Sequence, residues 1–79
     1  MLRDLPDGDE WIRVQSQVIG ARVLARRLEL RATQEAVYLA AGVDRRTLQA
    51  LEAGETNPTF STLARVAYVL GLPLAELVA

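Results

Sequence analysis

Apolar residues recur at helical spacing in five stretches of this chain. From residue 16 onward, positions spaced by four, four and three share one helical face: Ile19, Val23, Arg27 and Leu30. The same pattern begins less clearly at Trp11. Further helices are predicted over residues 34–41, 45–53, 60–70 and 73–79, and nothing reads as a convincing strand. The pattern therefore predicts a compact all-α domain of five helices.

Capping residues mark the ends of these helices. Thr33, Asp44 and Thr59 stand where N-caps are expected, and Pro73 suits the first turn of the last helix. Gly42, Gly54 and Gly71 stand where helices end. The inward residues predicted for the third and fourth helices are Leu48, Leu51, Phe60, Leu63, Val66, Ala67 and Leu70. Residues 1–15 are predicted to form an acidic N-terminal extension, and residues 16–79 the domain.

The helices over 34–41 and 45–53 are joined by a tight turn at Gly42, as in a helix-turn-helix motif. The first turn of the second helix carries Arg45 and Arg46, where the helix dipole favours anions. Two arginines placed against the dipole indicate an anionic partner. In the DNA major groove, arginine can bridge the O6 and N7 atoms of guanine. The alternative is a solvated pair of surface charges.

Two further places are candidates for binding DNA phosphates. Gln34 lies just inside the second helix, where its amide and the free N–H groups of the first turn can hold an anion. A second site is predicted at the start of the fourth helix, formed by Thr56, Asn57 and Thr59. The alternatives are an ordinary polar helix start and an ordinary connecting loop.

Arg27 and Glu52 each occupy an unfavourable position. Arg27 interrupts the apolar face of the first helix, and Glu52 lies in the last turn of the third, where the dipole disfavours an acid. A mutual ion pair between the two helices resolves both problems. It would be structural and would fix the angle of the third helix. The alternative is that both side chains extend to solvent.

Composition narrows the function. The 79 residues suffice for one domain and contain no cysteine and no histidine, so we expect no enzyme, no metal site and no cofactor. Net charge is −1, but residues 1–16 hold four acids against two arginines, whereas residues 17–79 hold seven arginines against six acids. All nine basic residues are arginine, which suits bidentate contacts, although a GC-rich coding bias explains it equally well.

No apolar run is long enough for a membrane span, and the acidic start lacks the apolar core of a signal peptide. A cytoplasmic protein is expected.

Two segments carry a family resemblance: IGARVLARRLEL and TQEAVYLAAGVDRRTLQALEAGETNPTFSTLARVAYVLGLPLAEL. Through them the chain, from about residue 18 to 78, resembles the lambda-repressor-like (Cro/repressor, or XRE-type) helix-turn-helix family. The resemblance implies that the glutamine at Gln34 binds phosphate and that Arg27 pairs with Glu52. It also implies a set of groove-facing positions: Asp44, Arg45, Arg46, Thr47, Gln49 and Ala50. Proteins of this family are usually dimeric on a pseudo-palindromic operator.

Four positions depart from the family pattern. Arg31 stands where the turn after the first helix usually has glycine, so that turn is expected to be built differently. Tyr38 replaces a small residue at a close helix crossing and needs extra room or a place at the rim. Leu24 and Leu39 are apolar where the family is usually charged. These two residues suggest an additional apolar contact. We also expect residues 11–16 to be ordered, with Trp11 packed on the domain or on a second copy.

The interpretation is a sequence-specific, double-stranded-DNA-binding transcriptional regulator, most simply a repressor acting as a homodimer. The dimer is predicted to form through the C-terminal apolar residues Tyr68, Leu72, Leu74, Leu77 and Val78. Small domains of this type serve in phage immunity, restriction control and toxin–antitoxin circuits, and this sequence is equally compatible with all three roles. The alternative is a protein-interaction module, or antitoxin-type partner of another protein, that kept the fold.

Overall fold

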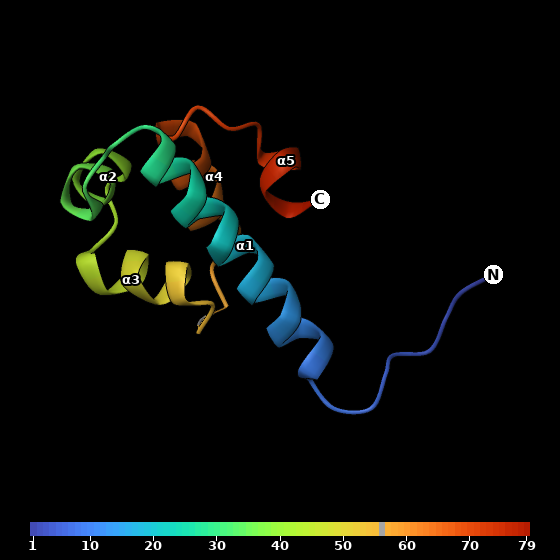
Figure 1. The fold of residues 1–79 in the computed structure, drawn as a ribbon. Coiled ribbons are helices and arrows are strands. Elements are labelled where there is room, and N and C mark those ends of the chain that lie inside the picture. Colours follow the sequence, from blue (N-terminus) through green and yellow to red (C-terminus); the bar gives the residue numbers. More distant parts are fainter. Residues whose placement is uncertain (56) are drawn as a thin grey trace.

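A computed structural model describes residues 1–55 and 57–79 and shows five helices in that part of the chain (Figure 1). The elements are α1 Glu10–Glu29, α2 Gln34–Ala41, α3 Arg45–Ala53, α4 Phe60–Val69 and α5 Leu74–Val78. None of the described residues lies in a strand, so the predicted all-α class is confirmed. No helix in the described residues is long and apolar enough to cross a lipid bilayer.

Helix α1 begins earlier than residue 16, where its helical pattern of apolar residues becomes clear. It begins at Glu10, so residues 10–15, which were expected in the N-terminal extension, belong to this helix. Its first turns project beyond the other helices (Figure 1). Residues 11–16 are therefore helical, but Trp11 is still 41% exposed within the single chain. The expected packing of Trp11 on its own domain is therefore incomplete.

The helix ends lie where the capping residues predicted them. The side-chain oxygens of Thr33, Asp44 and Thr59 each accept a hydrogen bond from the backbone N–H three residues ahead, at 2.8–3.1 Å. Gly42 and Gly54 end α2 and α3 in the left-handed conformation, with φ near +70°. Such local hydrogen bonds satisfy backbone groups that a helix end leaves without partners. They explain why these boundaries can be read from the sequence.

The core is formed by nine buried apolar residues contributed by all five helices and the residue following α4. They are Val23, Val37, Ala41, Leu48, Leu51, Val66, Ala67, Leu70 and Leu77. The prediction that Phe60 points inward was wrong, because this side chain is 74% exposed. Phe60 is the first residue of α4, and the core ends one turn later, at the partly buried Leu63. Helical spacing gives the direction of a side chain but not how far the neighbouring helices extend.

Helix α5 is held against α1 by packing and by an arginine. Leu77 is completely buried within the single chain. Arg22 of α1 donates hydrogen bonds to the carbonyls of Leu77 at 3.2 Å and Ala79, and Arg26 donates to the carbonyl of Leu70 at 2.9 Å. Cations at helix C-termini are favoured by the dipole and satisfy free carbonyls. Leu77 is thus a core residue, which corrects its assignment to a dimer interface.

Two glycines allow α1 and α3 to approach closely. A Cβ atom on the buried Gly20 would lie 2.3 Å from the carbonyl oxygen of Leu51, which is a severe overlap. A Cβ on Gly54 would lie 2.7 Å from the Cα of Gln17. Any larger residue at either place would push the two helices apart. The position of α3 on α1 therefore depends on these glycines.

The turn after α1 contains a residue in the left-handed backbone conformation, although that residue is an arginine and not a glycine. Arg31 has φ +53°, a conformation that is unfavourable for a residue with a Cβ. The expectation of a differently built turn was therefore wrong for the backbone, which adopts the shape that glycine favours. Tyr38 is half-buried against the core, while Leu39 is 67% exposed.

Candidate nucleic-acid interface

Helices α2 and α3 form a two-helix unit joined by residues 42–44. Gly42 adopts φ +70°, and the N–H of Val43 donates to the carbonyl of Tyr38 at 3.1 Å. Asp44 is extended and caps α3. The turn is thus closed by one left-handed glycine and one N-cap, which fixes the direction in which α3 leaves α2. This is the arrangement of a helix-turn-helix.

Helix α3 has a buried face and an exposed polar face. Leu48 and Leu51 are at most 1% exposed and anchor the helix in the core. The side chains of Arg45, Arg46 and Gln49 are exposed, whereas Thr47 and Ala50 are half-buried between the two faces. Within residues 1–55 and 57–79, neither arginine takes part in a salt bridge. Their guanidinium groups are therefore available to an anionic partner.

Asp44 serves α3 as its N-cap. Its Oδ1 atom accepts the backbone N–H of Thr47 at 2.8 Å. Hydrogen bonds from Thr47 hold the pKa of this exposed carboxyl below its usual value, with a smaller contribution from the charge of Arg46. The carboxylate also favours the positive end of the helix dipole. Asp44 thus stabilises the turn that presents the two arginines.

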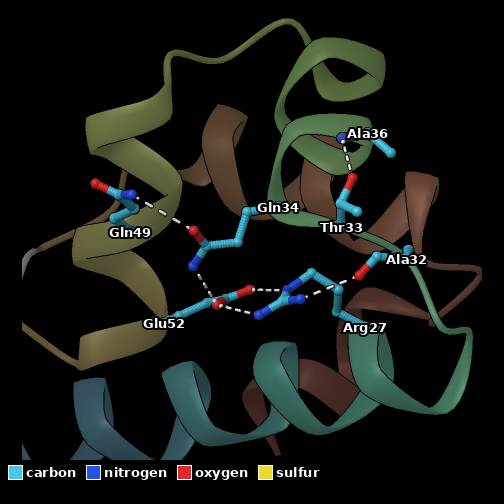
Figure 2. A network of polar contacts seen from close by, with 7 residues as sticks. All are labelled: Arg27, Ala32, Thr33, Gln34, Ala36, Gln49 and Glu52. Carbon is cyan, nitrogen blue, oxygen red and sulfur yellow. Dashed lines mark hydrogen bonds and ion pairs between the residues drawn. The ribbon is translucent and has the colours of Figure 1, made fainter.

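A buried ion pair connects α3 to α1 (Figure 2). Arg27 and Glu52 meet through two parallel hydrogen bonds, Nε to Oε2 at 2.7 Å and Nη2 to Oε1 at 2.9 Å. Their side chains are only 11% and 5% exposed. Arg27 also donates to the carbonyl of Ala32 at 3.0 Å, which ties the turn after α1 to the same group. The pair predicted from the two unfavourable positions is present, and the solvent-exposed alternative does not hold.

The pair shifts the pKa values of both partners so that both stay charged. Burial by itself would raise the pKa of Glu52, but hydrogen bonds from Arg27 and Gln34 outweigh burial and bring it below its usual value. The hydrogen bond to Glu52 raises the pKa of Arg27 against the opposing effect of burial. The two parallel hydrogen bonds of this buried pair thus compensate for the desolvation of both charges.

Gln34 belongs to the same network. Its Nε2 atom donates to Oε1 of Glu52 at 2.9 Å, and its Oε1 accepts a long hydrogen bond from Nε2 of Gln49 at 3.4 Å (Figure 2). An amide nitrogen carries two hydrogens, so the bond to Glu52 uses one of the two. The predicted phosphate ligand on α2 is thereby linked to Gln49, a predicted base-reading residue on α3. The two helices are held in register by polar contacts as well as by the core.

The structure describes two of the three residues of the second predicted phosphate site. Asn57 and Thr59 are exposed just before α4, whereas Thr56 lies outside the described residues. The hydroxyl of Thr59 caps α4 by accepting the N–H of Thr62 at 3.1 Å. Its side chain is thus committed to the helix start. The free N–H groups of that first turn remain the candidate anion ligands.

The predicted dimer residues divide into exposed and buried members. Tyr68 is 86% exposed on α4, and Val78 is 46% exposed on α5. Leu72 and Leu74 are half-buried against the core, and Leu77 is buried. A groove between α2 and α4 adjoins Tyr68 and is lined by Ala40, Ala41, Ala64, Arg65, Tyr68 and Val69. Tyr68 and Val78 are therefore the members with most apolar surface to offer.

Two residues that position the site were not found from the sequence pattern. Gly20 permits the close approach of α3 to α1. The sequence signal that could have identified it is a glycine inside a predicted helix, where glycine costs roughly 1 kcal/mol relative to alanine. Arg22 holds the end of α5, and nothing in its spacing indicated a partner more than fifty residues away. Both act by placing helices and not by contacting a ligand.

Comparison with known proteins gives a consistent assignment. The family described as helix-turn-helix matches residues 23–77, which is most of the chain. An uncharacterised HTH-type transcriptional regulator, y4dJ, of Sinorhizobium fredii is 37% identical over 62 residues, covering 78% of this chain and 80% of that protein. Among solved structures, the restriction-modification controller protein C.AhdI of Aeromonas hydrophila shares the fold with a TM-score of 0.77. That likeness has 23% identity and covers 81% of this chain and 97% of the other. The chain thus belongs to the lambda-repressor-like family of helix-turn-helix DNA-binding transcriptional regulators.

Proposed function

We propose that this protein is a sequence-specific transcriptional repressor that reads double-stranded DNA with α3. The observation that carries the proposal is the exposed polar face of α3, formed by Arg45, Arg46 and Gln49 on a helix anchored by Leu48 and Leu51. The buried Arg27–Glu52 pair fixes this helix on α1. A reading helix must be held rigidly because base contacts require accurate placement.

Base reading and phosphate binding are assigned to different residues. The two arginines of α3 contact base edges in the major groove, and Gln34 together with the start of α4 contacts phosphates on either side. Asp44, Thr47, Gln49 and Ala50 complete the face that lies in the groove. No cofactor, metal ion or chemical reaction is part of this function. We propose further that the protein acts in the cytoplasm of a prokaryotic cell.

The repressor is proposed to act as a homodimer through the exposed apolar residues near its C-terminus. Tyr68 and Val78 contribute most of this surface, and Leu72 and Leu74 contribute their exposed parts. A twofold dimer sets the two α3 helices roughly 34 Å apart, one DNA turn. The operator is then a pseudo-palindrome with half-sites about one turn apart.

Selection of bound sites from random DNA, followed by variant binding, tests the proposal. Arg45→Ala and Arg46→Ala should each weaken the selected site by roughly 1–3 kcal/mol, about fivefold to more than a hundredfold, and weaken random DNA less. Arg3→Ala removes an exposed arginine outside the helices and is the matched control. Equal binding of the selected site by the parent and both α3 variants would show that α3 is not the reader.

A second candidate function is supported by exposed apolar residues on the domain. Phe60, Tyr68 and Leu39 are each more than 65% exposed, and exposed apolar side chains of this size suit contact with a protein partner. The salt dependence of DNA binding separates the two functions, because each phosphate contact releases a counterion. A steep fall in affinity with salt supports the repressor. Negligible DNA binding at low salt, with capture of a defined protein, supports the interaction module.

A further inference from the structure

Helix α1 carries a second apolar face that points away from the core. Six residues at successive steps of three and four are all exposed: Trp11, Val14, Val18, Ala21, Ala25 and Leu28. The four large side chains are 41%, 44%, 38% and 59% exposed, in chain order. The buried Gly20 and Val23 lie on the opposite side of the helix. The exposed set, here called the α1 seam, runs the whole length of α1.

This arrangement is unusual for a surface helix of a small domain. Such a helix normally places polar residues on its outer side and one apolar stripe toward the core. Steps of three and four give an average period of 3.5 residues, the spacing of the contact positions in a two-stranded coiled coil. The α1 seam extends from Trp11 to Leu28, roughly 26 Å of helix. The outer face thus has both the length and the period of a helix-pairing surface.

We propose that the α1 seam is a second self-association surface, on which α1 packs antiparallel against α1 of another copy of this chain. An antiparallel pair places each first-half residue of one helix against a second-half residue of the other. Trp11 then lies against Leu28, Val14 against Ala25, and Val18 against Ala21. Each valine meets an alanine, Trp11 meets Leu28 in the outer layers, and a twofold axis repeats each layer once. The seam is therefore complementary to itself.

Charge favours the same orientation. The N-terminal end of the seam is acidic, with Asp7, Asp9 and Glu10, and the C-terminal end is followed by the exposed Arg31. An antiparallel pair brings the acidic end of one copy near Arg31 of the other, and Glu29 at that same end is already paired with Arg26 at 3.9 Å. The helix dipoles also oppose each other favourably. A parallel pair would instead bring the two acidic ends together.

The α1 seam is separate from the surfaces assigned to DNA binding and to the C-terminal dimer. The family match begins at residue 23, so Trp11, Val14, Val18 and Ala21 all precede it. The seam lies on α1, whereas Tyr68 and Val78 lie on α4 and α5. Two independent surfaces would join dimers into larger assemblies, so that protein bound at one operator can contact protein bound at another.

Analytical ultracentrifugation of four variants isolates the α1 seam. Ala25→Glu places a charge within the seam, opposite Val14 of the other copy, and Ala36→Glu makes the same change at an exposed alanine of α2. Tyr68→Glu disables the proposed C-terminal surface. With Tyr68→Glu alone, the protein should still dimerise through the seam. Adding Ala25→Glu should weaken that dimer at least tenfold, whereas adding Ala36→Glu should leave it unchanged. Circular dichroism checks that all the variants fold.

The outcomes separate this proposal from that of the C-terminal dimer. If Tyr68→Glu is already monomeric, or if Ala25→Glu behaves like Ala36→Glu, the seam does not self-associate, whatever the C-terminal surface does. If Tyr68→Glu has no effect while Ala25→Glu gives monomers, the seam is the dimer interface and the C-terminal surface is not.

Disulfide trapping tests the orientation, since the natural chain has no cysteine. A mixture of Val14→Cys and Ala25→Cys proteins should form a disulfide between the two variants. Val14→Cys alone should not, because the two Val14 positions of an antiparallel pair are roughly 16 Å apart along the helix axis. A disulfide between two Val14→Cys chains, or none in the mixture, would overturn the antiparallel pairing.

Discussion

Breaking the ion pair between Arg27 and Glu52 should be among the most destabilising changes in this protein. Arg27→Met removes the guanidinium and leaves Glu52, whose side chain is 5% exposed, with Gln34 as its remaining side-chain donor. Glu52→Met leaves a guanidinium that is 11% exposed without its carboxylate. Methionine is chosen because its unbranched chain fills similar space. Each single variant thus strands one charge in the interface between α1 and α3.

The expected magnitude follows from burial. Removing one partner of a buried pair costs about 3–5 kcal/mol, because the other charge has lost its compensation. A domain of 79 residues has a total stability of roughly 4–12 kcal/mol, so each single change removes a large share of it. The double variant loses the hydrogen bonds to Ala32 and Gln34 but strands no charge, and should cost only about 1–3 kcal/mol. The coupling between the sites should therefore be at least about 3 kcal/mol.

Urea unfolding of the parent, both single variants and the double variant measures this coupling as a double-mutant cycle. The exposed pair of Arg26 and Glu29, whose nearest N and O atoms are 3.9 Å apart, supplies the control. Glu29→Gln should change the free energy of unfolding by less than about 1 kcal/mol. Additive single effects at Arg27 and Glu52 would refute the reasoning, because independent losses mean that neither charge depends on the other.

The same pair predicts how stability depends on pH. The folded-state pKa of Glu52 lies below its usual value, so its contribution is fully present above the unfolded pKa, about 4.3. It is lost as the pH falls through the lower folded pKa, because the unfolded state then binds more protons than the folded state. Unfolding free energies of the parent and Glu52→Gln should therefore converge toward low pH. A difference that stays constant from pH 7 to pH 3 would contradict the shift.

Three further changes test the local geometry. Arg31→Gly should raise the free energy of unfolding by up to about 1 kcal/mol, because it relieves a left-handed arginine, and a lower thermal midpoint would speak against this strain. Gly20→Ala should lower it by about 1–3 kcal/mol or more, because a Cβ there overlaps the carbonyl of Leu51, while Gln15→Ala on the exposed side of α1 should be nearly neutral by the same thermal assay. Thr59→Ala should cost about 1 kcal/mol by removing the N-cap of α4, and an unchanged unfolding midpoint in urea would show that the cap is dispensable.

The sequence determined those features that depend on neighbouring residues. Thr33, Asp44 and Thr59 cap their helices through the backbone N–H three residues ahead, so the starts of α2, α3 and α4 were predictable. Gly42 and Gly54 mark helix ends because glycine tolerates positive φ. Helical spacing likewise placed Leu48 and Leu51 inside and Arg45 outside. These interactions span three or four residues, so neighbouring residues in the sequence are enough to determine them.

The tertiary structure decided everything that depends on how far one helix reaches along another. Leu77 was expected at a dimer interface and Phe60 in the core, yet Leu77 is fully buried and Phe60 is 74% exposed. The difference lies in whether another helix covers that turn, which no local spacing encodes. Gly20 gained its role only because the carbonyl of Leu51 meets it across the crossing of α1 and α3. Likewise, Gln34 was predicted to face phosphate, but only the packing of α2 on α3 shows that it also holds Glu52.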